Sequence, residues 1–280
     1  TPVIRGVAGA NYIIKITASG VTLDGLHVNL DPTYGSSGVQ TWDFITVSAP
    51  NAELKNLYIY QSDVATVADA ENEYIRGRRY KGIGLSGSGN NAKIIDCEIT
   101  GVCKGVHVGA VKNAYIPCCD IHLTQQSCIV FANTAAVNAG NLVFDNDLHD
   151  SAIEDGVQWV QDFNAPNPGT VTNNMGTIVR GNRIYGNREN ACDLKGARNV
   201  VIENNLIWGT FGSNNGELNG WNRSAFTAIS KGANADAYHV IIRGNVLMDN
   251  SNGIMAHNDY KIYHNVIVNN RHDYTGSNST

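Results

Sequence analysis

Apolar positions recur along the chain in a six-residue phrase that begins and ends with an apolar residue. The phrase reads LDGLHV (23–28), LKNLYI (54–59), IIDCEI (94–99), IPCCDI (116–121), VFDNDL (143–148), VRGNRI (179–184), IENNLI (202–207), IRGNVL (242–247) and IYHNVI (262–267). Such self-similarity is typical of a solenoid, in which each repeat forms one coil. The closest phrases lie 20, 22 and 23 residues apart, enough for three short strands and three turns. Nine phrases therefore predict about nine coils, some of which carry a loop insertion.

The fourth position of the phrase carries a run of asparagines. From the first phrase to the last it reads Leu26, Leu57, Cys97, Cys119, Asn146, Asn182, Asn205, Asn245 and Asn265. An asparagine tolerates a left-handed backbone, and its amide can bond the equivalent amide one coil away, about 4.8 Å along the axis. The sequence therefore predicts an asparagine ladder at the bend between two strands.

A second strand with alternating character precedes most phrases. Its alternate residues are expected to point into the core, namely Ile83, Val106, Ile129, Val157, Cys192, Thr227 and Ile254. The residues between them are expected to face solvent as one column, namely Gly84, His107, Val130, Gln158, Asp193, Ala228 and Met255. Long insertions flank this strand, and loops that emerge beside one face build the walls of a groove.

The fold expected from these patterns is an all-β, right-handed parallel β-helix of about nine coils, with residues 1–280 as a single domain. Composition agrees, because 42% of the residues are hydrophobic, only 16% are charged and glycine is abundant. The insertion over 63–80, acidic first and then basic, is expected to hold a short helix.

Charge and hydropathy exclude some classes of partner. The net charge of −5 and the lack of a Lys/Arg-rich run argue against nucleic acid, and no apolar run is long enough to span a membrane. Six cysteines without a CxxC pair disfavour zinc. They fit one or two disulfides of a secreted protein, or equally well small buried residues.

Reactive side chains are densest on two successive coils. Glu154, Asp155 and Gln158 lie on the first coil, and Asp193 and Lys195 lie on the second. Converging oxygen donors are what Ca²⁺ requires, so Glu154, Asp155, Gln158 and Asp193 are the predicted calcium ligands. Lys195 serves as a base if neighbouring positive charge lowers its pKa, whereas Asp193 favours the ammonium. The alternative is a plain ion pair between Asp193 and Lys195.

These residues carry a resemblance to a known group of proteins. The coils, the asparagine ladder and the site on this strand resemble the parallel β-helix polysaccharide lyases. The stretch Glu154-Asp155-Gly156-Val157-Gln158, with Lys195 37 residues after Gln158, is similar to the family 9 pectate lyases, although Gln158 stands where that family has an Asp. The strand around Lys195 also resembles, more weakly, the family 6 alginate and chondroitin lyases.

The resemblance implies β-elimination on a uronic-acid polymer by a secreted or cell-surface monomer. Calcium, or Arg188 in its absence, would neutralise the substrate carboxylate, and Lys195 would remove the C5 proton. Gln158, His257 and Trp221 are the expected substrate-binding residues.

Two other classes of function remain open at this point. A glycoside hydrolase needs two carboxylates about 5 to 9.5 Å apart, for which Asp155 and Asp193, or Glu154 and Asp193, are candidates. A non-catalytic β-helix, such as an adhesin or a carbohydrate-binding module, is the other class. The first recognisable coil begins close to residue 1 without a recognisable capping helix, which is typical of a piece of a larger protein.

Overall fold

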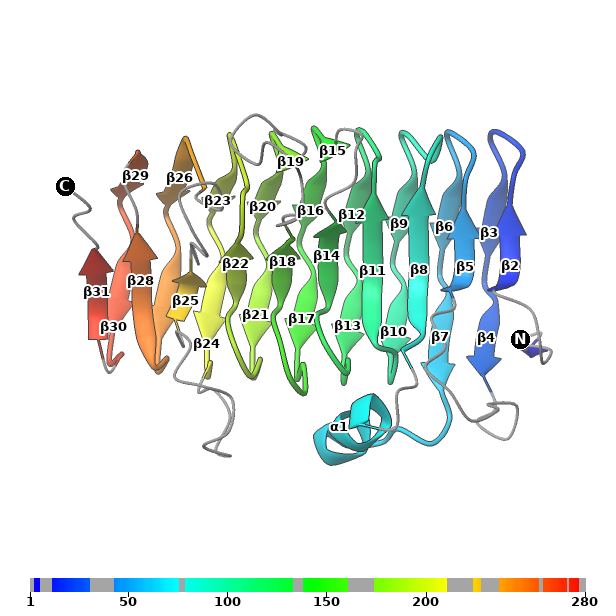
Figure 1. The fold of residues 1–280 in the computed structure, drawn as a ribbon, viewed down its shortest axis with the longest axis horizontal. Coiled ribbons are helices and arrows are strands. Elements are labelled where there is room, and N and C mark those ends of the chain that lie inside the picture. Colours follow the sequence, from blue (N-terminus) through cyan, green and yellow to red (C-terminus); the bar gives the residue numbers. More distant parts are fainter. Residues whose placement is uncertain are drawn as a thin grey trace.

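The computed structural model forms an elongated parallel β-helix (Figure 1). It describes residues 3–5, 12–30, 43–75, 79–132, 138–160, 174–210, 224–227, 237–256, 259–270 and 272–276. Three long parallel sheets, here named A, B and C, run side by side along the axis, with the two described ends of the chain at opposite ends of the solenoid. The fold class expected from the sequence is confirmed.

The strands of each sheet follow one another in chain order. Sheet A contains β1 (Val3–Arg5), β4 (His27–Leu30), β7 (Tyr58–Gln61), β10 (Glu98–Thr100), β13 (Asp120–His122), β17 (Asp147–His149), β21 (Arg183–Tyr185), β24 (Leu206–Trp208), β27 (Val246–Met248) and β30 (Val266–Val268). Sheet B contains β2 (Tyr12–Ile16), β5 (Asp43–Val47), β8 (Lys81–Ser86), β11 (Lys104–Gly109), β14 (Ile129–Ala132), β18 (Val157–Trp159), β22 (Cys192–Leu194), β25 (Ser224–Thr227), β28 (Asn252–Ala256) and β31 (His272–Gly276). Sheet C contains β3 (Thr22–Asp24), β6 (Glu53–Lys55), β9 (Lys93–Ile95), β12 (Tyr115–Pro117), β16 (Leu142–Phe144), β20 (Ile178–Arg180), β23 (Val201–Glu203), β26 (Val240–Arg243) and β29 (Tyr260–Tyr263).

Each six-residue phrase crosses the bend from sheet C to sheet A. In the second phrase, for example, Leu54 belongs to β6 and Ile59 belongs to β7, and both are completely buried. The phrase therefore has an apolar residue at each end because both ends point into the core. Among the described residues sheet C has nine strands, one for each phrase, so the expected number of coils is confirmed.

The strand with alternating residues that was predicted before each phrase belongs to sheet B. Ile83, Val106, Ile129 and Val157 are in register on neighbouring strands and are all 0% exposed. They belong to one continuous core that runs through the described coils. The interior of the solenoid is thus filled by stacked columns of like residues, as in other repeat proteins.

The predicted asparagine ladder is present. Each amide of the first four ladder residues donates to the side-chain oxygen of the next, at 2.9 Å in every step from Asn146 to Asn265. The same oxygens also accept the backbone N–H of the preceding ladder residue. Every ladder amide donates in addition to a backbone carbonyl within the sheet C strand of the preceding coil, for example from Asn205 to Val179. The ladder therefore satisfies polar backbone groups of the bend that would otherwise be buried without a partner.

One detail of the sequence prediction was wrong. The left-handed backbone belongs to the residue that precedes each ladder asparagine, as at Asp145 (φ 52°), Gly181 (φ 70°) and Asn204 (φ 55°). The reason is that the ladder asparagine has to aim its amide along the axis, while the residue before it makes the bend. Asp, Asn and Gly tolerate this conformation better than most other residues.

The cysteines are small buried residues and not disulfides. All six are free thiols, and all but Cys118 are buried. Cys97 and Cys119 occupy the ladder position on adjacent coils, where the Cys119 thiol lies 3.4 Å from the carbonyl oxygen of Ile94. This contact resembles the amide-to-carbonyl contact that the ladder asparagines make on later coils.

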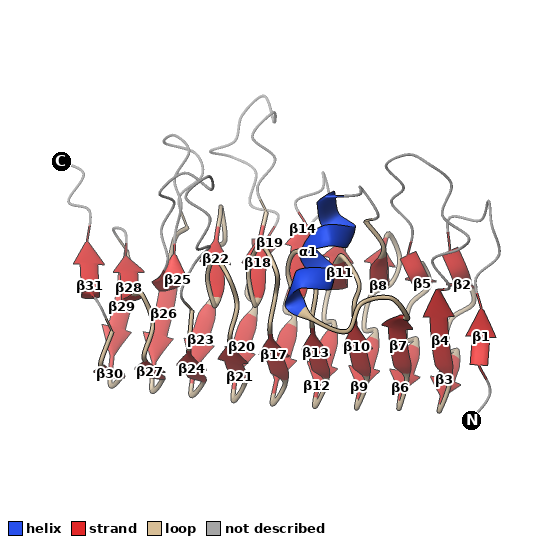
Figure 2. Ribbon diagram, turned by 90° about the horizontal axis from the view of Figure 1, so that it is seen from below, coloured by secondary structure: helices blue, strands red, loops and turns tan. Residues whose placement is uncertain are grey.

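The insertion after β7 holds the short helix expected from the sequence, α1 (Val67–Ile75). It lies beside the turns that follow sheet A (Figure 2), where Ala70 and Val67 pack against Ala152 and Leu123. No helix within the described part of the chain has the length and apolar character needed to cross a membrane.

Replacement of a central ladder residue is expected to destabilise the solenoid. In Asn205→Ala, the amide of Asn182 and the carbonyl of Val179 each lose a buried partner. At about 1–3 kcal/mol for each unsatisfied buried group, we expect the free energy of unfolding to fall by about 3 kcal/mol. Urea denaturation measures it, with Asn72→Ala on the exposed side of α1 as the control. Equal stability of the two variants would contradict a stabilising role of the ladder.

Candidate functional site

Two neighbouring coils of sheet B bring predicted site residues together. Gln158 in β18 and Asp193 in β22 are paired in the parallel register of the two strands. Lys195 follows β22 directly and forms an ion pair with Asp193. Gln158, Asp193 and Lys195 therefore lie on one side of the sheet, in the register that the alternation predicts.

The part of this column around Asp193 is not open to solvent, contrary to the sequence prediction, whereas His107 and Met255 of the same column are partly exposed. Gln158 is only 5% exposed, and Val130 and Asp193 are 0% exposed. A buried polar side chain is stable only when a partner replaces its water. The side chains around Asp193 therefore form a network of mutual contacts, and only part of that network reaches the surface.

Asp155 lies at the centre of this network. Its two carboxyl oxygens accept hydrogen bonds from the side-chain amides of Asn190 (2.8 Å) and Gln158 (2.9 Å). Complete burial, together with the negative charges of Glu189 and Asp193, raises the pKa of Asp155 well above its ordinary value. Both effects disfavour the carboxylate, so the neutral acid is favoured over a wider pH range than in a free Asp.

Lys195 is held as an ammonium ion. Burial alone would lower its pKa, but the negative charges of Asp193 and Asp155 outweigh burial and raise the pKa above the ordinary lysine value. The Lys195 side chain retains 14% exposure, whereas Asp193 has none. Lys195 is thus the member of the pair that can contact a ligand, and its side chain is positively charged when it does so.

Glu154 and Arg188 contact residues outside the network around Asp193. The Glu154 carboxylate accepts hydrogen bonds from Gln126 (2.8 Å) and Ser127 (3.1 Å) on the preceding coil. Arg188 donates to the Ala152 carbonyl at 2.8 Å and pairs with Glu71 of α1 at 2.8 Å. In this arrangement Arg188 fastens α1 to the solenoid.

The acidic residues do not share one centre in the described structure. Glu154, Asp155 and Asp193 each have separate protein partners, and the described residues contain no group of three or more His, Cys, Asp or Glu side chains arranged for a metal ion. Ca²⁺ takes six to eight oxygen ligands, a larger set than these contacts leave available. We therefore assign no reaction step to calcium, and the calcium site stays a prediction.

Two of the expected substrate-binding residues lie outside the described residues, namely Trp221 and His257. Their contribution to the site stays a prediction from the sequence.

Sequence reasoning missed an aromatic stack on the outer face of sheet A. Rings of four successive coils lie face to face, with centroids 5.0, 4.5 and 4.2 Å apart, in the order His122, His149, Tyr185 and Trp208. Each of these residues follows directly after a six-residue phrase, so reading that position down the repeat would have revealed the column. The rings pack on one another, which leaves their faces unavailable for a sugar and indicates a structural role.

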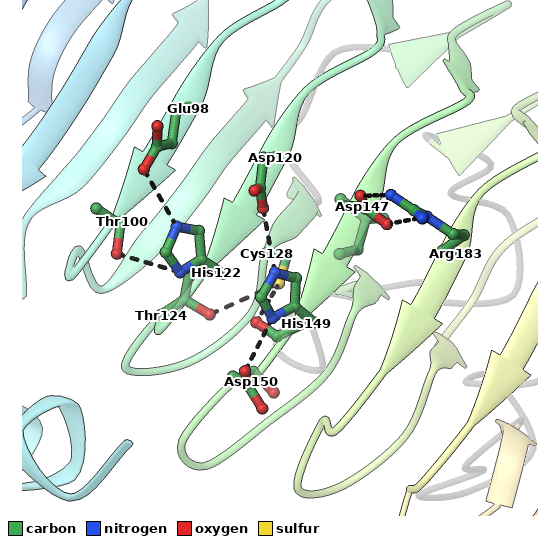
Figure 3. Close-up of polar contacts among 12 residues, drawn as sticks. Glu98, Thr100, Asp120, His122, Thr124, Cys128, Asp147, His149, Asp150 and Arg183 are labelled. Atoms are coloured by element: carbon green, nitrogen blue, oxygen red, sulfur yellow. Dashed lines mark hydrogen bonds and ion pairs between the residues drawn. The ribbon is translucent and has the colours of Figure 1, made fainter. Parts of the chain in front are cut away.

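His149 is the charged member of this stack (Figure 3). Its ring nitrogens contact Asp150 at 2.8 Å and Asp120 at 3.1 Å. Burial disfavours the imidazolium, but the hydrogen bonds with the two carboxylates outweigh burial and raise the pKa of His149 to about 9. Beside it, Arg183 pairs with Asp147 on the neighbouring strand. The polar groups of this part of sheet A are thus satisfied by one another.

Neither protein-family models nor curated protein sequences match the chain. Several solved structures have a similar fold and match the chain. An alginate lyase from Paenibacillus sp. strain FPU-7 aligns with a TM-score of 0.62 and 14% sequence identity, over 98% of each chain. The A-module of the mannuronan C-5 epimerase AlgE4 from Azotobacter vinelandii aligns with a TM-score of 0.57 and 13% identity, over 99% of this chain and 81% of that module.

A third similar structure is the periplasmic alginate epimerase AlgG, with a TM-score of 0.55 and 13% identity over 94% of this chain and 68% of that one. The tailspike of E. coli bacteriophage HK620, in complex with a pentasaccharide, shares 12% identity and a TM-score of 0.52 over 98% of this chain and 52% of the tailspike. At these identities, the likeness establishes the parallel β-helix fold alone.

The raised pKa of His149 predicts a specific pH dependence of stability. The folded-state pKa of about 9 lies above the ordinary value of 6.5, so the stabilisation is complete below pH 6.5 and is lost as the pH rises through 9. The free energy of unfolding of wild type relative to His149→Gln should therefore fall between about pH 6 and pH 10, by about 1 kcal/mol after solvent screening. Urea denaturation at both pH values measures this difference. A constant difference would show that the charge of His149 contributes nothing.

Proposed function

We propose that the chain acts on an acidic polysaccharide, as a lyase that cleaves a uronic-acid polymer by β-elimination. The observation that carries this proposal is the Lys195 ammonium, held by buried Asp193 at the edge of sheet B. Support comes from the β-helix neighbours, which include an alginate lyase, a mannuronan C-5 epimerase and an alginate epimerase. We further propose a secreted or cell-surface monomer, in keeping with the neighbour that is named periplasmic.

The proposed reaction needs a positive charge beside the substrate carboxylate. A base removes the proton from C5, the C–H electron pair forms the C4–C5 double bond, and the C4–oxygen bond breaks with protonation of the leaving oxygen. Neutralising the carboxylate on C5 acidifies that proton and lowers the barrier. An ammonium held in place before the substrate arrives needs no reorganisation during the reaction.

Lys195 fits this charge-neutralising role in the protonation state that its surroundings favour. To act as the base instead, Lys195 would first have to lose its proton, against the field of Asp193 and Asp155. Arg188, the other candidate from the sequence, would have to leave Glu71 to reach a substrate. The proposal therefore assigns the carboxylate contact to Lys195.

A glycoside hydrolase is the second candidate, and the surroundings of Asp155 favour it. A raised pKa suits Asp155 to a general acid, and the second carboxyl group, Asp193, forms an ion pair with Lys195. A carboxyl group with a raised pKa near a second carboxyl group is a pattern of acid–base pairs in enzymes. Both side chains are completely buried, so this mechanism requires the network to open.

Product analysis separates these functions. On pectate, alginate or a glycosaminoglycan, a lyase forms unsaturated ends that absorb in the ultraviolet, and a hydrolase forms reducing ends without that absorbance. A carbohydrate-binding or adhesin-type protein forms neither.

Substitution of Lys195 tests the charge-neutralising role. We expect Lys195→Gln to lower the lyase rate by about 10³-fold, because the charge opposite the substrate carboxylate is lost. Lys195→Arg retains the charge but cannot give up a proton at ordinary pH, and we expect it to keep activity within about tenfold of wild type. The matched control is Lys55→Gln, at a surface ion pair on sheet C. Full loss of activity in Lys195→Arg would instead support a Lys195 base. Repeating the assay with a chelator tests the predicted calcium requirement.

The pH–rate profile gives an independent test. Because the pKa of Lys195 is raised, its neutral form grows about tenfold per pH unit throughout the alkaline range. If Lys195 acts as an ammonium, the wild-type rate should not rise with the population of neutral Lys195. The rates of wild type and of Lys195→Arg should then depend on pH in the same way between about pH 8 and pH 10. A wild-type rate that rises tenfold per pH unit, with no such rise in Lys195→Arg, would overturn the ammonium role.

A further inference from the structure

A second positively charged region lies on sheet B, nearer its N-terminal end. Lys81 begins β8 and Lys104 begins β11, and the two residues are paired in the register of these strands. Burial raises the pKa of the Cys103 thiol to about 12, and the positive charges of Lys104, Arg79 and Lys81 oppose that rise. Three cationic side chains thus gather within one small region of a protein whose net charge is −5.

The acidic side chains near this region do not neutralise all of its positive charges. Asp43 pairs with Lys81 at 3.2 Å and accepts a hydrogen bond from Thr46 at 3.1 Å. Glu154, which also acts on Cys103, is bonded to Gln126 and Ser127. Within the described residues, Lys104 has no ion-pair partner.

His107 stands on the same strand as Lys104 and presents a neutral ring. Burial, together with the charges of Lys81 and Lys104, lowers the pKa of His107 to about 3. No described residue makes a hydrogen bond to its ring nitrogens. The neutral ring can therefore donate one hydrogen bond to an incoming anion without competing with a protein acceptor.

His107 has two register partners on the neighbouring strands. On one side it is paired with Gly84 of β8, over which the carboxylate of Asp43 lies. On the other side it is paired with Val130 of β14. The next outward positions on these three coils carry the short residues Ser86, Gly109 and Ala132. The cationic groups and the hydrogen-bond donor thus occur together.

We propose that Lys81, Lys104 and His107 form a subsite that binds a carboxylate of an acidic polysaccharide, on the same sheet as Lys195 and three coils away from it. This inference rests on the proposed function. At about 4.8 Å per coil the two positions lie about 14 Å apart along the axis, and Lys195 is offset from the level of His107 by a further two residues along the strand direction. A chain of a few sugar residues can bridge this span. One polymer chain laid along sheet B would therefore contact both positions.

Binding in two positions predicts a dependence on chain length. A disaccharide can occupy one position at a time, whereas a hexasaccharide can occupy both and gain affinity without any new type of contact. We expect wild type to bind hexauronates at least about tenfold more tightly than diuronates. We expect Lys104→Gln and His107→Ala to lose most of that gain, and Lys104→Arg to keep it because the charge is retained.

Titration calorimetry with di-, tetra- and hexasaccharides of mannuronate and of galacturonate measures this gain. Lys93→Gln is the matched control, because Lys93 is an exposed lysine in an ion pair on sheet C. Urea denaturation of each variant confirms that it is folded, and Lys195→Gln tests the other position in the same way. Neutral hexasaccharides and inorganic phosphate serve as further probes.

The outcomes separate the two proposals. If wild type gains affinity with length and Lys104→Gln gains equally, the subsite is wrong while the proposed function stands. If wild type binds none of the uronates, the proposed function fails and the subsite with it. Binding of phosphate as tightly as of hexauronate would identify a general anion site, and that result also overturns the polysaccharide subsite.

Discussion

Parallel pairing of each strand with the equivalent strand of the next coil is the constraint on which this structure depends. It places the same position of every repeat about 4.8 Å from its counterpart, so like side chains meet whether they are apolar, amide, thiol or aromatic. The asparagine ladder between sheets C and A and the ring stack on sheet A both follow from this spacing. Because each coil contacts only its neighbours, stability is the sum of such repeated contacts.

The same constraint explains why the candidate site is a network of charges. Gln158 and Asp193 are brought together by strand register, and Lys195 follows on the second strand. Their burial forces every charge to have a partner, since an unpaired buried charge is costly. The result is a lysine whose charge is fixed in place, which suits the recognition of an anionic sugar better than the removal of a proton.

Sheets A and B use charged residues differently. On sheet A, His149 lies between Asp120 and Asp150, and its charge is satisfied within the protein. On sheet B, Lys104 and His107 lack such partners among the described residues, while Lys195 keeps part of its surface exposed. Both sheets belong to the same solenoid, and this difference in pairing is the reason why we propose that sheet B, and not sheet A, binds a ligand.

The solenoid, the number of coils and the ladder could be predicted from the amino-acid sequence, because repeated positions carry the same kind of residue and periodicity needs no knowledge of distant contacts. The sequence also placed Gln158, Asp193 and Lys195 on one side of sheet B, since strand alternation fixes the side to which each residue points. The tertiary contacts were needed to show that Asp193 is buried, that Arg188 pairs with α1 and that the charges around Lys195 outweigh the effect of burial on its pKa. Burial and pKa depend on every neighbour around a group, and those neighbours come from different coils and from an insertion that no repeat pattern places.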